Sequence, residues 1–178
     1  VFAKLERGEV RLYPVTIPEG WTRWDIAREV ARLQLASREA FLAATEGIDP
    51  VRDLAPQAET LEGYLFPDTY HFARPSDPEH MVRVMVARSR AVYESIPRSP
   101  SPSHPLLTAH QTVTLASLVE KETSLDSERG LIAAVLLNRL RRGLPLQCDP
   151  TVIYAARWGS DGAFDGVIHV SDLERESP

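Results

Sequence analysis

The chain has 178 residues, of which 43% are hydrophobic and 25% are charged; these proportions exclude an intrinsically disordered chain and indicate an ordinary globular protein. Its formal net charge of −5 argues against a general nucleic-acid-binding protein, because such proteins usually carry a basic face. No apolar run approaches the length that a bilayer-spanning helix needs. The single cysteine, Cys148, excludes an intrachain disulfide and a zinc site built on paired cysteines.

The first part of the chain predicts one strand followed by two short helices. Residues 10–17 are rich in β-branched and aromatic side chains and alternate in character, which is typical of a strand. After a turn, we expect a helix over 22–35 and a shorter helix over 37–47. Thr22 and Ser37 are placed to cap these two helices.

The two helices could form a helix-turn-helix DNA reader, but no basic face accompanies them, so we expect residues 1–57 to form a small N-terminal strand–helix subdomain. The stretch 61–70 is dense in aromatic residues and broken by glycine and proline, which predicts a loop leading into a short strand over 69–72. A proline at a first-turn position opens a long helix over 78–96. Residues 97–105 hold four prolines and three serines, which predicts a linker.

The last part of the chain predicts three helices. The first spans about 108–123, and the second spans about 127–142 and ends at Gly143. The core of the second helix, 131–137, is apolar on all sides, which predicts a helix surrounded by protein. A short third helix is expected over 149–157.

The first of these helices ends in two glutamates, Glu120 and Glu122, which are candidates for acid–base chemistry. At about 100° per residue, Leu118 and Val119 share an arc of the helix with Glu122, whereas Glu120 points to the other side. We therefore expect Glu122 to be held against the core, where burial raises the pKa of a carboxyl group, as a general acid near neutral pH requires. Glu120 is expected to face a wall of the site or to form a structural salt bridge. The alternative is that the Glu-Lys-Glu run is a solvated helix end.

Several polar residues near the second and third helices are further candidates for a site. Asn138 lies on an apolar side, where an amide is expected to bond either within the protein or in a site. Gln147, Asp149 and Tyr154 offer groups suited to sugar hydroxyls, although Asp149 is favoured as the N-cap of the third helix. Cys148 is expected to be a half-buried small side chain rather than a nucleophile.

Four segments together resemble the YceG-like family of endolytic murein lytic transglycosylases. They occur in the family order and span most of the chain: residues 15–20 (VTIPEG), 61–70 (LEGYLFPDTY), 116–123 (ASLVEKET) and 138–154 (NRLRRGLPLQCDPTVIY). The first segment alone would be a weak signal, but chance agreement of all four is negligible. Cys148 departs from the polar residue that the family usually has there. The family also continues beyond residue 178, so we expect a C-terminally incomplete part of a longer chain.

The resemblance implies a bacterial enzyme anchored in the inner membrane by a single span that is absent from this stretch, with its globular part facing the cell wall. Its substrate would be the glycan strand of peptidoglycan, cut internally between N-acetylmuramic acid and N-acetylglucosamine to leave 1,6-anhydro-N-acetylmuramic acid ends. Its partners would be glycan strands and cell-wall synthases but no nucleic acid, and no cofactor or metal is expected.

The implied fold is α+β and mainly helical. Residues 58–178 would form a lysozyme-like helical catalytic domain, and residues 1–57 would be the end of a LysM-like region.

In the family pattern the catalytic acid is the second glutamate of the Glu-Lys-Glu-Thr run, which matches Glu122. Glu122 would protonate the glycosidic oxygen and then accept the proton of the muramoyl 6-hydroxyl, so that one carboxyl serves first as acid and then as base. The pair Glu122–Thr123 is also similar to the Glu-Ser pair of lysozyme-like lytic transglycosylases. The residues expected to bind the sugar chain are Glu120, Asn138, Gln147, Asp149, Tyr154 and Tyr64.

Two other functions fit the sequence. A non-catalytic module would hold glycan strands as a scaffold for the synthesis machinery and would cut nothing. A true muramidase would hydrolyse the same bond and would need a second carboxylate opposite Glu122, for which Asp149 and Glu128 are the candidates. The lack of a convincing partner carboxylate in the sequence favours the lytic reaction.

Overall fold

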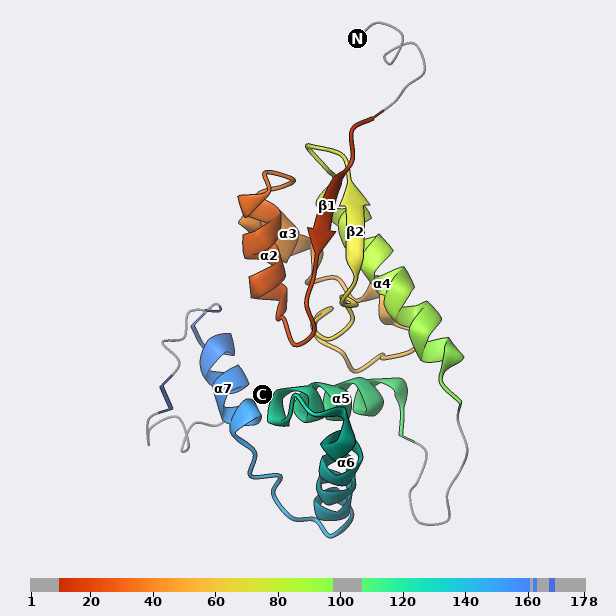
Figure 1. The fold of residues 1–178 in the computed structure, drawn as a ribbon, viewed down its shortest axis with the longest axis vertical. Coiled ribbons are helices and arrows are strands. Elements are labelled where there is room, and N and C mark those ends of the chain that lie inside the picture. Colours follow the sequence, from red (N-terminus) through yellow and green to blue (C-terminus); the bar gives the residue numbers. More distant parts are fainter. Residues whose placement is uncertain (1–9, 98–106, 161, 163–166, 169–178) are drawn as a thin grey trace, which may run out of the picture. The chain divides into compact units, whose positions relative to one another are not determined.

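The computed structural model describes residues 10–97, 107–160, 162, 167 and 168. Within them the chain forms six α-helices and one two-stranded sheet, so the fold is α+β and mainly helical, as predicted (Figure 1). The chain divides into two compact units, residues 1–97 and 98–178. Among the described residues, no helix combines the length and the apolar character needed to cross a membrane.

The division between the units falls at residues 97 and 98 rather than at the expected position between residues 57 and 58. The reason is the pairing of two strands, β1 (Tyr13–Thr16) and β2 (Thr69–Phe72), which run antiparallel with Val15 opposite Tyr70. This ladder joins segments that lie more than fifty positions apart in the sequence. The Thr16 and Thr69 hydroxyls add a hydrogen bond of 2.9 Å between the two strands. The part of the chain around β2 therefore completes the N-terminal unit.

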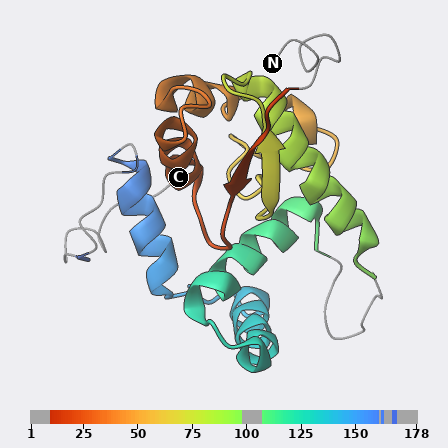
Figure 2. The same cartoon turned by 45° about the horizontal axis from the view of Figure 1, so that its top comes forward.

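The helices of the N-terminal unit pack around the strand pair. They are α2 (Arg23–Arg32), α3 (Arg38–Ala44) and α4 (Pro78–Ser95), with a short 3₁₀ helix, η1 (Asp49–Val51), between the last two. Helix α3 packs against both α2 and α4, and α4 runs beside β2 (Figure 2). Phe72 of β2 meets His80 of α4 edge to face, with ring centroids 6.2 Å apart.

Local capping explains where the first two helices begin and end. The Thr22 hydroxyl accepts from the N–H of Asp25, and the Asp25 carboxylate accepts from the N–H of Thr22 at 3.1 Å, which forms a capping box. Ser37 caps α3 through its hydroxyl. Both predicted caps are therefore confirmed. Helix α2 ends before the expected residue 35 because Gln34 adopts a left-handed φ of 55°, which no regular α-helix contains.

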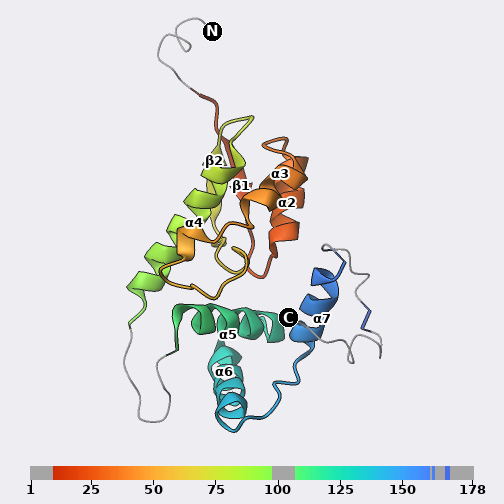
Figure 3. The same ribbon diagram turned by 180° about the vertical axis from the view of Figure 1, so that it is seen from behind.

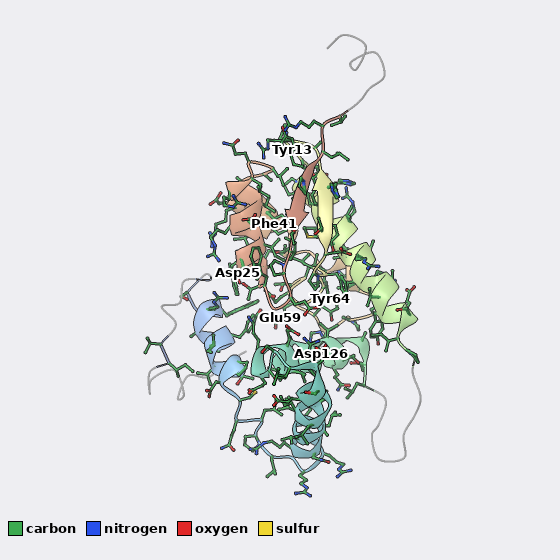
Figure 4. The ribbon with its side chains drawn as sticks, viewed as in Figure 1. Tyr13, Asp25, Phe41, Glu59, Tyr64 and Asp126 are labelled. Atoms are coloured by element: carbon green, nitrogen blue, oxygen red, sulfur yellow. The ribbon has the colours of Figure 1, made fainter. Side chains whose placement is uncertain are left out.

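The core of the N-terminal unit is apolar and closed to water, and Figure 4 marks Phe41 as one of its members. Its largest fully buried side chains come from α2, α3, α4 and the connecting segments; they include Ile26, Leu35, Phe41, Leu61, Met81 and Met85. Leu61 is also fixed through its backbone, because its N–H donates to the carbonyl of Thr45 at 2.8 Å. The loop that precedes β2 is thereby tied to the end of α3.

Glu62 lies at the N-terminus of α2. Its carboxylate accepts a hydrogen bond from the N–H of Arg23 at 3.0 Å, one of the helix-end donors that lack an intrahelical partner. The Arg23 side chain is itself buried and paired with Glu46. Burial raises the pKa of Glu62, although hydrogen bonding and attraction at Arg23 oppose the shift.

The C-terminal unit contains α5 (Ala109–Glu122), α6 (Asp126–Arg141) and α7 (Asp149–Trp158), close to the predicted positions. The prediction that α6 is surrounded by protein is wrong for one of its faces. Leu131 and Val135, one turn apart, are 70% and 50% exposed, whereas Leu136 on the other side is 4% exposed. Helix α6 packs on α5 along the side that carries Leu136, which leaves Leu131 and Val135 on its other face exposed.

We expect Phe41→Ala to lower the free energy of unfolding by about 3 to 5 kcal/mol, because the substitution leaves a cavity in a fully buried site. Urea titrations followed by circular dichroism measure this change. Leu42→Ala is the matched control, since Leu42 is the adjacent and only partly buried residue of α3. Equal losses in the two variants would contradict the core assignment.

We expect Glu62→Gln to change how stability depends on pH. The folded-state pKa of Glu62 lies above the ordinary value of 4.5, so the native protein binds this proton more tightly than the unfolded chain does. The stabilisation that comes from this proton is complete below the pKa that Glu62 has in the unfolded chain. It is lost as the pH rises through the pKa that Glu62 has in the folded protein. Glutamine keeps an oxygen for the N–H of Arg23 but does not ionise. The unfolding free energy of the wild type should therefore fall relative to that of the variant as pH is raised from about 4 to about 8; a difference independent of pH would refute the shift.

Candidate functional site

Helix α5 carries the two candidate glutamates and has well-defined ends. At its start, the Thr108 hydroxyl accepts from the N–H of Gln111 at 3.2 Å, and the Gln111 side chain accepts from the N–H of Thr108 at 3.0 Å. At its end, Thr123 adopts an extended conformation with φ −149° and ψ 144°. Glu120 and Glu122 therefore lie in the last turn, just before the chain leaves the helix axis.

A small apolar cluster holds α5 against its neighbours. Leu118 and Val119 of α5 pack with Leu136 of α6 and with Cys148, directly before α7. Partly buried side chains surround this cluster, namely Leu115, Ile132, Ala133 and Leu146. Cys148 is 8% exposed, so its predicted role as a small packing residue is confirmed. Figure 3 shows α6 next to α5, with its axis running across that of α5.

Glu120 is paired across the two helices. It is partly buried, and its Oε2 lies 3.3 Å from Nη2 of Arg129 in the first turn of α6. Arg129 also lies 3.4 Å from a carboxylate oxygen of Asp126, whose position at the start of α6 is labelled in Figure 4. The structural salt bridge expected for Glu120 is therefore present.

Glu122 is exposed, so the expectation that the C-terminal unit buries it against the core is wrong. Leu118 and Val119, on the same arc, are 9% and 8% exposed. The helix ends at Glu122, however, and the chain turns away through Leu125, which is itself 55% exposed. Glu122 therefore lies on the same arc of the helix as buried residues, but among the described residues of this unit no element covers the last turn there.

The turn that follows Glu122 is fixed by side-chain hydrogen bonds. The Thr123 hydroxyl donates to Oε2 of Glu128 at 2.8 Å and accepts from the N–H of Leu125 at 3.0 Å. The N–H of Thr123 donates to the carbonyl of Val119 at 3.3 Å. The residue directly after the candidate acid is therefore held by both helices.

The two candidate amides are engaged by arginines of α6. Oδ1 of Asn138 accepts from Arg141 at 3.0 Å, which supports the structural alternative for this residue. Oε1 of Gln147 accepts from Arg139, and Arg139 also donates to the carbonyl of Pro145 at 2.7 Å. These bonds join the end of α6 to the segment that leads into α7.

Asp149 and Tyr154 both lie on α7. The prediction that Asp149 is the N-cap is wrong, because Cys148 occupies that position and Asp149 is the first helical residue. Among the described residues, no side chain caps the start of this helix. Tyr154 is half-buried, and its ring centroid lies 6.0 Å from that of Trp158 at a tilt of 45°. Trp158 was missed as a candidate, although its position four residues after Tyr154 places both rings on one helix face.

Tyr64 belongs to the other unit. Its side chain is buried, and burial raises the pKa of its hydroxyl to about 12. The described geometry therefore brings Glu120, Glu122, Asn138, Gln147, Asp149 and Tyr154 together in one unit, with Tyr64 in the core of the N-terminal unit. Within the described residues, no group of three or more His, Cys, Asp or Glu side chains could hold a metal ion.

Comparisons with known proteins identify a family model and several relatives. A model of the YceG-like family matches residues 1–178. The endolytic murein transglycosylase of Bacillus subtilis (strain 168) is 30% identical over 181 residues, covering 93% of this chain and 48% of that protein. The enzyme of that name from Streptococcus pneumoniae (strain R6) is 35% identical over 174 residues, covering 84% of this chain and 30% of that protein.

A solved structure agrees with these relatives. The crystal structure of a yceG-like protein, lmo1499, from Listeria monocytogenes superposes with a TM-score of 0.71 at 26% identity, covering 99% of this chain and 61% of that one. The chain spans about half or less of the length of the curated relatives it matches. The match of the family model from the first residue to the last shows that the chain belongs to the YceG-like family.

Proposed function

We propose that this chain carries the catalytic part of a lytic transglycosylase that cuts the glycan strands of peptidoglycan internally. The observation that carries the proposal is the family match over residues 1–178, together with relatives that are named endolytic murein transglycosylases. We assign the cleavage reaction to the C-terminal end of α5, at the turn into α6, where the Glu-Lys-Glu-Thr run ends.

In this proposal Glu122 is the single catalytic carboxyl. Its proton passes to the glycosidic oxygen while the bond from that oxygen to the anomeric carbon of N-acetylmuramic acid breaks. The resulting carboxylate takes the proton of the muramoyl 6-hydroxyl, whose oxygen bonds to the anomeric carbon and closes a 1,6-anhydro ring. Acid and base are thus one residue acting in sequence, and no water is consumed.

The pairing of Glu120 with Arg129 supports the choice of Glu122 over Glu120. The Glu120 carboxylate is already engaged in a contact with a guanidinium of the next helix at 3.3 Å, so in this proposal it serves the pairing of the two helices and Glu122 is left for the substrate. Glu122 is exposed, so in this proposal the bound glycan is what excludes water from it. Closing a site around the reacting groups strengthens every electrostatic interaction within it.

The proposal extends to the surroundings of the reaction. Polar groups of Asn138, Gln147, Asp149 and Tyr154 lie in the same unit as Glu122 and would contact sugar hydroxyls, with Glu120 as a wall of the site. We also propose a lysozyme-like arrangement for the helical unit and a LysM-like origin for the N-terminal unit. The whole protein would be anchored in the inner membrane, with this part facing the wall and its synthases.

We expect Glu122→Gln in the full-length protein to lower the release of anhydro-muramoyl fragments from purified glycan strands by at least about a hundredfold, the usual scale of general acid–base catalysis. Glu120→Gln should still yield these fragments. Chromatography with mass spectrometry measures the products, and circular dichroism checks the fold of each variant. The opposite pattern, with Glu120→Gln inactive and Glu122→Gln active, would overturn the assignment.

The products should also be free of solvent oxygen. In isotopically labelled water, a lytic enzyme leaves no label in the new chain ends, because the 6-hydroxyl of the substrate is the nucleophile. Labelled, reducing N-acetylmuramic acid ends would instead identify a hydrolytic muramidase. Binding of glycan strands without any cleavage by the wild type would identify a non-catalytic scaffold.

A further inference from the structure

Two contacts between α5 and α6 flank Glu122, one on each side in sequence. Two residues before it, Glu120 is paired with Arg129 at 3.3 Å. One residue after it, the Thr123 hydroxyl donates to Glu128 at 2.8 Å. Glu128 and Arg129 are consecutive residues in the first turn of α6, so one short stretch of α6 makes side-chain contacts on both sides of the candidate acid.

The contact to Glu128 determines how the Thr123 hydroxyl is used. A hydroxyl has one proton to donate and lone pairs to accept with. The proton of Thr123 goes to Glu128, and a lone pair accepts from the N–H of Leu125 at 3.0 Å. The Thr123 hydroxyl therefore connects the turn to Glu128 on one side and to the backbone of Leu125 on the other. Glu128 is the group that orients this hydroxyl.

This arrangement matters because Glu122 is exposed. A long, exposed side chain keeps most of its rotamer freedom, so the backbone at residues 122 and 123 determines which region its carboxyl can reach. Catalysis depends steeply on such placement, and a shift of about 1 Å can cost about a hundredfold in rate.

We propose that Glu128 is a positioning residue for the transglycosylase reaction and that it acts through the hydroxyl of Thr123 on the placement of Glu122. This inference rests on the proposed function. Glu128 then serves as a hydrogen-bond acceptor and not as the second carboxylate of a hydrolase. An acidic residue in the first turn also suits the positive end of the α6 dipole.

The experiment compares truncating and conservative variants in the full-length protein. Glu128→Ala and Thr123→Val each remove the hydrogen bond, and we expect kcat for anhydro-product release to fall about tenfold or more with little change in KM. Glu128→Gln and Thr123→Ser keep an acceptor and a hydroxyl, and we expect them to retain most of kcat. The double variant Thr123→Val with Glu128→Ala should be no slower than the slower single variant, because residues that act as a unit are not additive.

Matched controls separate positioning from a general loss of stability. Glu79→Ala removes an acidic residue from the first turn of α4, and Thr112→Val removes a hydroxyl that bonds to the carbonyl of Thr108 at the far end of α5. Both should leave kcat unchanged. Thermal melting of all variants checks that the fold is kept.

Three results would overturn the inference. If Glu128→Ala keeps the wild-type kcat, Glu128 has no positioning role, while the proposed function stands. If Glu128→Gln is as inactive as Glu122→Gln, Glu128 acts as a carboxylate. If the wild type yields no anhydro products under any condition tested, the proposed function fails and this role fails with it.

Discussion

The termination of α5 at Thr123 is the constraint on which the candidate site depends. Leu118 and Val119 anchor the last turns of the helix in a cluster with Leu136 and Cys148, and the extended conformation of Thr123 then directs the chain away. The end of the helix is consequently packed through Leu118 and Val119, whereas the Glu122 side chain is exposed. The exposed carboxyl therefore projects from a backbone whose position is fixed by packing, which a flexible loop could not provide.

The two neighbouring glutamates differ through their partners and not through their position along the helix. Both lie in the last turn of α5, yet Glu120 contacts Arg129 of α6, whereas Glu122 is exposed. A charged partner on the next helix engages Glu120, and Glu122 is left to the substrate in the proposed reaction. The short connection between α5 and α6 is what brings Arg129 and Glu128 back to this end of α5.

Much of the local structure could be predicted from the sequence, because its causes lie within a few residues. Thr22 and Ser37 cap their helices through N–H groups three positions away, and the Pro at the start of α4 marks its first turn. The segments that resemble the YceG-like family also identify the family without any coordinates, since they depend only on the order of side chains.

The order of residues by itself determined the helices, the caps at Thr22 and Ser37, the packing role of Cys148 and the family of the chain. The tertiary structure decided what each helix face touches. It paired β2 with β1 and so placed the boundary between the units after residue 97. It left the side chains of Leu131, Val135 and Glu122 exposed. It also made Asp149 the first residue of α7 rather than its cap. The physical reason is that a helical periodicity states the direction of a side chain, whereas burial requires another element to lie in that direction, and that element comes from elsewhere in the chain.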